Sequence, residues 1–374
     1  MTKNSPVINR GLPKDWQDGI FLGRIEMGEG PVPILIRDGR VFDMARVAPT
    51  VSALIASGIR SGGEPLGTIE VLAEAGLLPP IDLQCVKACG VTFAVSALER
   101  VIEERARGDH VAAAGIRSRI EAVLGGSVRS TVPGSPGADA LKQTLIDEGM
   151  WSQYLEVAIG PDAEVFTKCP VLSAVGQDAE IGVRSDSGWN NPEPEVVLIA
   201  GPDGKAAGAT LGNDVNLRDF EGRSALLLGK AKDNNASCSI GPFIRLFDDG
   251  FTMDDVRAAD VAMTIEGEDG YVLEGHSTMR EISRDPEDLL RQTMSEHQYP
   301  DGFALFCGTL FAPTQDRNEP GRGFTHKPGD VVTISSARLG TLVNRVTTSA
   351  QAPAWTFGIG DLFSNLARRG LLPA

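Results

Sequence analysis

The sequence lacks the marks of several large protein classes. Its 374 residues contain no apolar run near the roughly 20 residues that a membrane-spanning helix needs. No cluster of Lys and Arg occurs, and the formal net charge is -15, with 50 acidic and 35 basic residues. That charge disfavours nucleic acids and anionic membranes as partners. No Gly-x-Gly-x-x-Gly turn follows a strand, so the sequence does not support a nicotinamide dehydrogenase. The segment around Gly229-Lys230 also lacks the rest of a phosphate-binding loop.

Cysteine and histidine are scarce. The five cysteines are an odd number in a long chain, which is typical of reduced thiols rather than a disulfide framework. Cys85 and Cys89 lack the second Cys or His pair that a zinc site needs. The four histidines have no partner at ligand spacing, so we expect structural or surface roles for them: His110, His276, His297 and His326. The polar N-terminus does not resemble a signal peptide, and we expect a cytoplasmic protein.

What is present is typical of a soluble globular chain, with 42% hydrophobic and 23% charged residues. Residues 20–47 alternate like β-strands around Asp38-Gly39, a strong hairpin signal. Residues 95–125 change to helical spacing. A segment rich in Gly, Ser and Pro at 126–137 is typical of a linker, and a third helix is predicted at about 138–149.

Beyond residue 151 the pattern is mostly β. It predicts a buried strand over Glu195–Ala200 and hairpins within 260–277 and 331–346. We therefore predict an α+β protein that is mostly β, in three parts. These are a small β-rich N-terminal domain at 1–85, a helical connecting region at 86–150 and a large β-rich domain at 151–374.

Two acids with strand spacing suggest a metal site. Glu193 and Glu195 are two residues apart, so on an extended strand both side chains point to one face. Adjacent carboxylates repel each other unless a cation lies between them, and hard oxygen donors suit Mg²⁺, Mn²⁺ or Ca²⁺. Taken alone, the pair is more typical of a solvated strand end, because Glu is mostly exposed in proteins.

A third acid and a lysine follow this pair. Asp214 comes where an apolar strand ends in a turn, and Lys232 lies 18 residues later in a polar segment flanked by glycine. Three carboxylates with a nearby ammonium would hold a metal-chelated anion. Spacing along the sequence does not by itself bring these residues together.

The order of five motifs resembles the fumarylacetoacetate hydrolase family over about residues 160–350. The motifs are Glu193–Glu195, Asn213–Val215, Lys232–Pro242, Gly308-Thr309 and Lys327–Asp330. The resemblance implies a fold of mixed, rolled β-sheets with a smaller N-terminal domain, assembled as a homodimer or homotetramer. It also implies Mg²⁺, with Mn²⁺ or Ca²⁺ as substitutes, held by Glu193, Glu195 and Asp214. Lys232 and Thr309 would then face the substrate.

One position departs from the family pattern. Its hydrolases and decarboxylases carry a His followed three residues later by a Glu, and this pair activates water. In the matching stretch Gly90–Glu99, Ser96 stands in place of the His, while Glu99 is retained. A serine hydroxyl does not titrate near neutral pH, so it cannot replace imidazole as a general base. The departure disfavours hydrolysis of a carbon–carbon bond.

A closer resemblance is to the 2-keto-3-deoxypentonate dehydratases of this family, of the xylonate and arabinonate type. It is carried by Trp189–Glu195, by Gly212–Asp219 and by Glu164, which matches the acid at the dehydratase site. We therefore expect a Mg²⁺-dependent lyase that converts a 2-keto-3-deoxy-D-pentonate to 2-oxoglutarate semialdehyde through a metal-stabilised enolate.

The hypothesis assigns roles to seven residues besides the three metal ligands. Glu164 is the expected base, Lys232 stabilises negative charge or forms a Schiff base, and Glu99 is a third catalytic candidate. Expected substrate contacts are Ser96, Thr309, Arg184, Asn235 and Lys232 itself. Two alternatives stay open: an acylpyruvate hydrolase or oxaloacetate decarboxylase of the same family, and a sugar-acid binder without catalysis.

Overall fold

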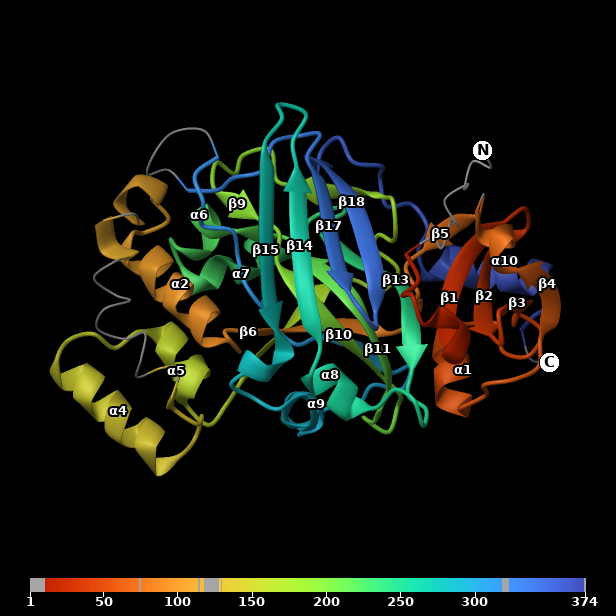
Figure 1. The fold of residues 1–374 in the computed structure, drawn as a ribbon, viewed down its shortest axis with the longest axis horizontal. Helices are drawn as coiled ribbons and strands as arrows, with labels where there is room; N and C mark the ends of the chain where they lie inside the picture. Colours follow the sequence, from red (N-terminus) through yellow and green to blue (C-terminus); the bar gives the residue numbers. More distant parts are fainter. Residues whose placement is uncertain are drawn as a thin grey trace, which may run out of the picture.

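The fold is built from two packed β-sheets with helices at the periphery. The computed structural model describes residues 11–73, 75–113, 115–117, 128, 130–317 and 323–372. In Figure 1 the smaller sheet lies in front, the N-terminal strands lie at the right, and the helices α2, α4 and α5 lie at the left. The chain ends on the same side as the N-terminal strands.

The larger sheet has 11 strands in the order β4-β3-β2-β1-β13-β11-β10-β16-β6-β7, with β5 paired to β1. Its strands are β1 (Phe21–Met27), β2 (Gly30–Arg37), β3 (Arg40–Asp43), β4 (Glu64–Thr68), β5 (Gly76–Leu78), β6 (Cys85–Gly90), β7 (Glu164–Cys169), β10 (Pro194–Ala200), β11 (Ala206–Asp214), β13 (Cys238–Leu246) and β16 (Phe303–Phe306). All pairs are antiparallel except β16 with β6.

The smaller sheet has five strands in the order β15-β14-β17-β18-β8. They are β8 (Glu180–Val183), β14 (Asp260–Glu266), β15 (Val272–Thr278), β17 (Val331–Ser336) and β18 (Gly340–Thr348). The short strands β9 (Asn190–Asn191) and β12 (Asn216–Leu217) form a separate pair.

Short helices connect the strands. They are α1 (Val51–Ser57), α2 (Ala94–Arg105), α4 (Pro136–Asp147), α5 (Gln153–Ile159), α6 (Arg218–Glu221), α7 (Leu228–Lys232), α8 (Met253–Arg257), α9 (Pro286–Met294) and α10 (Ile359–Arg368). The local sequence determines where α4 begins: the side chain of Ser135 caps this helix, and Pro136 lies in its first turn. Within the described residues no helix is both long and apolar enough to cross a membrane.

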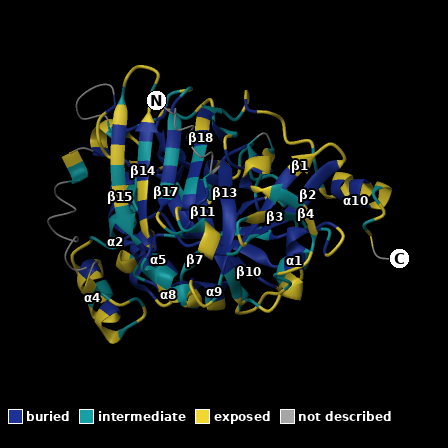
Figure 2. Ribbon diagram, turned by 45° about the vertical axis from the view of Figure 1, so that its right-hand side comes forward, coloured by how far each residue is buried: buried dark blue, intermediate teal, exposed yellow. Residues whose placement is uncertain are grey.

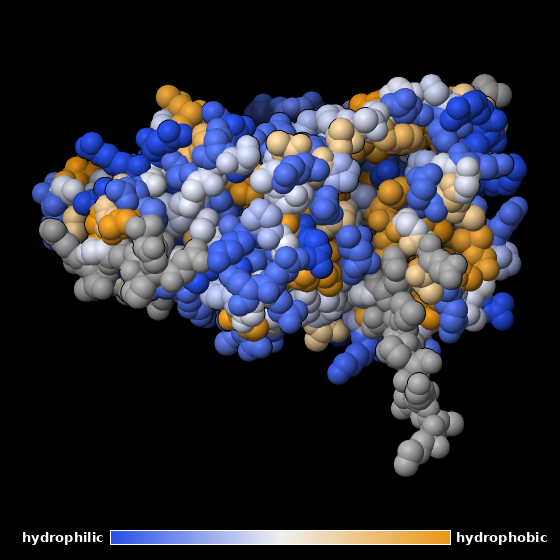
Figure 3. All heavy atoms as spheres, turned by 90° about the horizontal axis from the view of Figure 1, so that it is seen from above, coloured by the Kyte–Doolittle hydropathy of each residue, from blue (hydrophilic) through white to orange (hydrophobic). Residues whose placement is uncertain are grey.

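The central strand β10 is buried on both faces, which explains its continuous apolar run. Val196, Leu198 and Ala200 pack into the core between the two sheets, where they meet Met263 and Ile334 and their neighbours. The alternate residues, Val197 and Ile199, pack into a second core on the opposite face of the large sheet. Figure 2 shows this central region as buried, whereas exposed residues gather at the helices and loop ends. The face in Figure 3 is mostly hydrophilic, with scattered apolar groups.

Several sequence-based expectations are confirmed. The first hairpin turns at Asp38-Gly39 between β2 and β3, the strand expected at 195–200 is β10, and the later hairpins are β14–β15 and β17–β18. The helix expected at 138–149 begins two residues earlier, at Pro136. Of the helical pattern expected at 95–125, residues 114 and 118–125 lie outside the described residues.

The proposed division at residues 85 and 150 stays a prediction. The large sheet runs across the first boundary, because β1 pairs with β13 and β6 pairs with β16. All five cysteines are free thiols.

Candidate metal and active site

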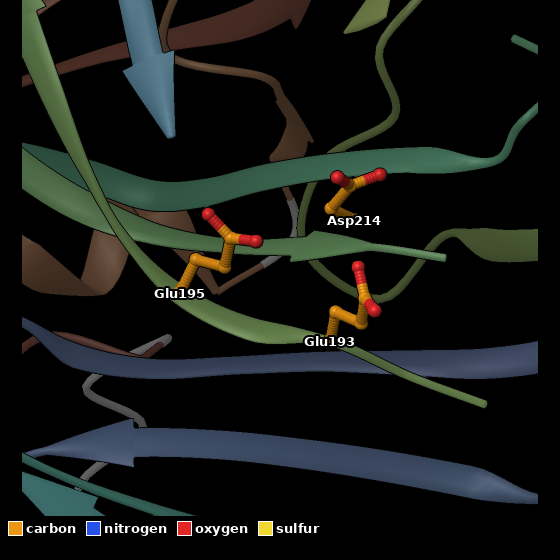
Figure 4. Close-up of side chains that lie close together, drawn as sticks. All are labelled: Glu193, Glu195 and Asp214. Carbon is orange, nitrogen blue, oxygen red and sulfur yellow. The ribbon is translucent and has the colours of Figure 1, made fainter. Parts of the chain in front are cut away.

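Three buried carboxylates converge at one end of the large sheet (Figure 4). Glu193 and Glu195 lie at the start of β10, and Asp214 ends the neighbouring strand β11. The register of this pair places Pro194 opposite Asn213 and Glu195 opposite Gly212. One oxygen from each of the three side chains lies within 4.8 Å of the others. The structure therefore brings together the three acids that the sequence nominated as metal ligands.

Two hydrogen bonds to the backbone of Glu193 fix its position relative to Asp214. The side-chain oxygen of Asn213 accepts a 3.0 Å hydrogen bond from the backbone N–H of Glu193. The backbone N–H of Asp214 donates to the carbonyl oxygen of Glu193, also at 3.0 Å. Through these two bonds the Asn213-Asp214 pair, which ends β11, holds Glu193 at the start of β10.

The Gly-Thr motif holds the second acid. The backbone N–H of Gly308 donates to Glu195 Oε2 at 2.7 Å, and Thr309 Oγ1 donates to Glu195 Oε1 at 3.2 Å. Gly308 has a φ of 106°, which disfavours residues with a side chain, and a Cβ there would clash with the hydroxyl of Thr92. A glycine is therefore needed to direct this N–H at Glu195.

Three cations lie against the carboxylates. Lys232 Nζ is 2.5 Å from Glu193 Oε2 and 3.1 Å from Asp214 Oδ2. Lys168 Nζ is 2.8 Å from Asp214 Oδ1, and Arg100 Nη2 is 2.8 Å from Glu193 Oε1. All three pairs are shielded from solvent, so their attraction is stronger than on the surface.

The pKa values reflect this setting. Burial raises the pKa of Glu195 well above its usual value, and the nearby Asp214 and Glu193 raise it further. Burial also disfavours the charged form of Asp214, but Lys168 and Lys232 outweigh it and lower that pKa. For Lys232, burial is likewise outweighed by Asp214 and Glu193, which raise the pKa of the ammonium.

The charges around the cluster are unequal. Five carboxylates face three cations: Glu164, Glu193, Glu195, Asp214 and Glu221 against Arg100, Lys168 and Lys232. Glu103, which also contacts Arg100, is paired with Arg218. With all five carboxylates ionised, two negative charges are unbalanced in a buried site, which is costly without a counter-ion and accounts for the raised pKa values of Glu164, Glu195 and Glu221. A divalent cation would balance them, and three oxygen donors suit Mg²⁺, so the residues fit such an ion.

A cavity of about 30 Å³ opens beside the carboxylates. Of the residues nominated from the sequence, six line it: Ser96, Glu164, Glu193, Asp214, Lys232 and Thr309. This volume is small for a five-carbon acid, so side chains around the cavity must move when such a molecule binds. Among the described residues no histidine lines the cavity.

Glu164 reaches the cavity because its neighbour is a glycine. It begins β7 opposite Gly90 of β6, and a methyl group on Gly90 would clash with Glu164 Oε2. Burial raises the pKa of Glu164, although Arg100 and Lys232 lower it. A carboxylate with a raised pKa, close to a metal site, is suited to proton transfer.

Four nominated residues lie outside the cavity lining: the ligand candidate Glu195, and Glu99, Arg184 and Asn235. Glu99 is on α2, and its carboxylate contacts Arg117 and, at 3.6 Å, Arg218. The charge of Glu99 is thus paired outside the cavity, and its catalytic role stays a prediction.

Arg184 and Asn235 were expected to contact the substrate. The guanidinium of Arg184 donates to both oxygens of Asp186 at 2.8 Å and to the side chain of Asn234 at 3.1 Å. The amide of Asn235 donates to the carbonyl oxygens of Ser349 and Pro353. Both side chains are thus held by local partners. Ser96 does line the cavity, but its hydroxyl also donates to the carbonyl of Phe93 at 2.8 Å and accepts from the Phe93 N–H, which caps α2.

Sequence reasoning missed three charged residues of the site: Arg100, Lys168 and Glu221. Helical spacing could have found the first, since Arg100 lies one turn after Ser96 on α2. Strand alternation could have found the second, since Lys168 lies four residues after Glu164 on β7. Glu221 lies on α6 and lines the cavity, but its spacing to the other motifs carries no signal.

Comparison with known proteins agrees with this geometry. Residues 156–347, just over half of the chain, match the family described as fumarylacetoacetate (FAA) hydrolase C-terminal. The chain belongs to the fumarylacetoacetate hydrolase family. The matched segment contains all three clustered carboxylates, Lys232 and Thr309.

Two curated relatives are similar over part of their length. A probable 2-keto-3-deoxyxylonate dehydratase of Haloferax volcanii is 32% identical over 202 residues, which cover 54% of this chain and 66% of the relative. A 2-dehydro-3-deoxy-D-arabinonate dehydratase of Saccharolobus solfataricus is 31% identical over 186 residues, which cover 49% and 58%. The match thus spans less than two thirds of either relative.

Solved structures share the fold over most of the chain. A 2-keto-3-deoxyarabinonate dehydratase aligns with a TM-score of 0.62 at 23% identity, covering 88% of this chain and 98% of that one. A fumarylacetoacetate hydrolase from Exiguobacterium antarcticum aligns with a TM-score of 0.56 at 17% identity, with 88% and 99% covered. The expected fold of mixed β-sheets is confirmed.

Proposed function

We propose that the protein is a Mg²⁺-dependent dehydratase of a 2-keto-3-deoxy-D-pentonate, which it converts to 2-oxoglutarate semialdehyde. One observation carries the proposal. The carboxylate Glu164 faces the same cavity as Glu193 and Asp214, whereas the position of the family's water-activating His is occupied by Ser96. The site therefore offers a base for removing a carbon-bound proton but not the pair that activates water.

Glu193, Glu195 and Asp214 would hold the metal ion. When bound, Mg²⁺ supplies Lewis-acid chemistry that polarises the 2-keto group and makes the C3 protons more acidic. Thr309 and Gly308 keep Glu195 in place through their two hydrogen bonds. Mn²⁺ and Ca²⁺ have the same preference for oxygen donors and are proposed as substitutes.

Glu164 acts as the base. Its carboxylate takes a proton from C3, the electron pair forms the C3–C4 double bond, and the C4 hydroxyl leaves as water with the help of an acid. The unsaturated product still carries a hydroxyl on C5, and its tautomerisation gives the aldehyde 2,5-dioxopentanoate, which is 2-oxoglutarate semialdehyde. Lys232 stabilises the negative charge that develops on the keto acid.

The activities named for similar proteins support this substrate class. Both curated relatives are named as dehydratases of a 2-keto-3-deoxypentonate. One solved dehydratase that shares the fold is described as complexed with magnesium and 2,5-dioxopentanoate. We further propose a cytoplasmic homodimer or homotetramer, a setting with which the five free thiols are consistent.

The test is a substrate panel for the purified protein with Mg²⁺. The panel contains 2-keto-3-deoxypentonates of D and L configuration at C4, a 2-keto-3-deoxyhexonate, acetylpyruvate and oxaloacetate, with products followed by NMR. Preferential formation of the five-carbon aldehyde from the D-pentonate supports the proposal. Cleavage of acetylpyruvate or loss of CO₂ from oxaloacetate, without the aldehyde, would replace it with a hydrolase or decarboxylase.

A further inference from the structure

Every oxygen of the three clustered carboxylates lies close to a hydrogen-bond donor or a cation. Glu195 is held by Gly308 and Thr309. Glu193 has Arg100 on one oxygen and Lys232 on the other, at 2.8 and 2.5 Å. Asp214 has Lys168 on one oxygen at 2.8 Å and Lys232 on the other at 3.1 Å. The cations on Glu193 and Asp214 therefore compete with a divalent ion that would bind the triad.

Lys168 and Arg100 are fixed by other contacts. Lys168 is fully buried, and its ammonium also donates to the backbone carbonyl oxygens of Lys232 and, at 3.5 Å, Val215. Arg100 is held at the same time by Glu103 and Glu221. Neither cation can leave without abandoning several buried partners.

Lys232 differs from both. Within the described part of the chain, the ion-pair and hydrogen-bond partners of its ammonium are all carboxylates: Glu193, Asp214 and, at 3.9 Å, Glu221. It ends the five-residue helix α7, and its side chain lines the cavity. Glu221 also lines the cavity, and its Oε1 is the acceptor 3.9 Å from this ammonium.

We propose that Lys232 is an internal counter-ion that bridges Glu193 and Asp214 before metal binds and moves to Glu221 when a divalent ion takes its place. The inference rests on the proposed function only in treating the triad as the metal site. It adds two roles: Lys232 lowers the metal affinity of the free protein, and Glu221 is the positioning residue that receives the displaced ammonium.

The movement of Lys232 couples the binding of the metal to the binding of the keto acid. Once displaced, the ammonium faces the cavity, where an anionic keto acid binds beside the metal. The keto acid therefore stabilises the displaced state of Lys232, and metal and keto acid strengthen each other's binding. A movement of this side chain also enlarges a cavity that is otherwise small for a five-carbon acid.

The test measures Mn²⁺ affinity by electron paramagnetic resonance, without any keto acid. The variants are K232M, K232Q, E221Q and K232M/E221Q, and the matched control is K230M, which removes the exposed lysine two residues away on α7. We expect K232M and K232Q to bind Mn²⁺ about tenfold more tightly than the wild type, a typical size for coupling between sites. K230M should bind it like the wild type.

Glu221 is tested in the same titrations. E221Q should weaken Mn²⁺ binding in the wild type and weaken it much less in the K232M background, where no ammonium needs a receiving group. Equal losses in the two backgrounds would overturn the role of Glu221. Wild-type or weaker Mn²⁺ affinity in folded K232M and K232Q would overturn the role of Lys232.

A second measurement uses the wild-type protein and needs no variant to fold. Acetylation of lysines by a small reagent is followed by mass spectrometry, with and without Mn²⁺. Lys232 should react faster when Mn²⁺ is bound, whereas Lys168 should not change; an unchanged rate at Lys232 contradicts the exchange. These readouts involve no turnover, so the dehydratase assignment stands or falls separately.

Discussion

Arg100 and Glu193 form an ion pair of 2.8 Å that joins helix α2 to the carboxylate cluster. The same guanidinium contacts Glu103 and Glu221, so one largely buried arginine contacts three acids. Burial disfavours its charge, but these acids outweigh burial and raise the pKa of Arg100 well above its usual value. The pair places Ser96, one turn earlier on α2, at the edge of the site.

Replacing Arg100 by Met should destabilise the protein strongly. It leaves buried carboxylates without their partner, which typically costs about 3–5 kcal/mol. Urea unfolding measures the change, and Arg105→Met, at an exposed position of the same helix, is the control that should change little. If the two variants unfold at the same urea concentration, Arg100 does not compensate these acids.

Glu164→Gln should abolish most turnover and leave the metal ligands intact. Loss of a general base typically lowers kcat by about 10²–10⁴-fold. Asp162→Asn, an exposed acid two residues before it, is the control and should retain wild-type kcat. Wild-type turnover in Glu164→Gln would assign the proton transfer to another group.

Ser96→His should not create carbon–carbon hydrolysis. Although it restores the imidazole of the family pattern, Glu99 is held by Arg117 and cannot complete the water-activating pair. The measurement is release of pyruvate from acetylpyruvate in the presence of Mg²⁺. Appearance of hydrolysis in the variant would show that only the imidazole separated this protein from its hydrolytic relatives.

His326 should make stability depend on pH. Burial lowers the pKa of His326, although Asp330 at 3.4 Å raises it, so the folded protein favours the neutral imidazole. The unfolded chain has the ordinary pKa of about 6.5 and binds more protons below it. The free energy of unfolding should therefore decrease as the pH falls below about 6.5.

The matched variants for this effect are His326→Gln and His297→Gln. His297 is exposed, so its replacement should leave the pH dependence as in the wild type, whereas His326→Gln should flatten it. Urea unfolding between pH 5 and 8 provides the comparison. Identical pH dependence in all three proteins would rule out a contribution from His326.

The cluster of three carboxylates could be predicted from the sequence because its determinants are local. Glu193 and Glu195 are placed on one side by strand spacing, and Asp214 follows in an Asn-Asp pair that contacts the first of them. Lys168 lies at strand spacing from Glu164 on β7, and Arg100 lies at helical spacing from Ser96 on α2. They were missed because Lys and Arg are usually exposed, so their spacing alone does not indicate that they point into a buried site.

Other features depend on contacts that the sequence does not encode locally. Arg184 lies between two motifs, yet its guanidinium is taken up by Asp186 and Asn234. The N-terminal strands join the large sheet through Phe21 and Arg245, which are far apart in the chain. Hydrophobic periodicity indicates that such strands exist but not which strand pairs with which.

The central claim is tested most directly by turnover of 2-keto-3-deoxy-D-pentonate with Mg²⁺ and then with an excess of chelator. The account predicts that 2,5-dioxopentanoate forms with Mg²⁺, that its formation stops with the chelator and that it resumes when Mg²⁺ is restored. Failure to form the aldehyde with Mg²⁺ present, or the same rate after the metal is removed, would contradict it.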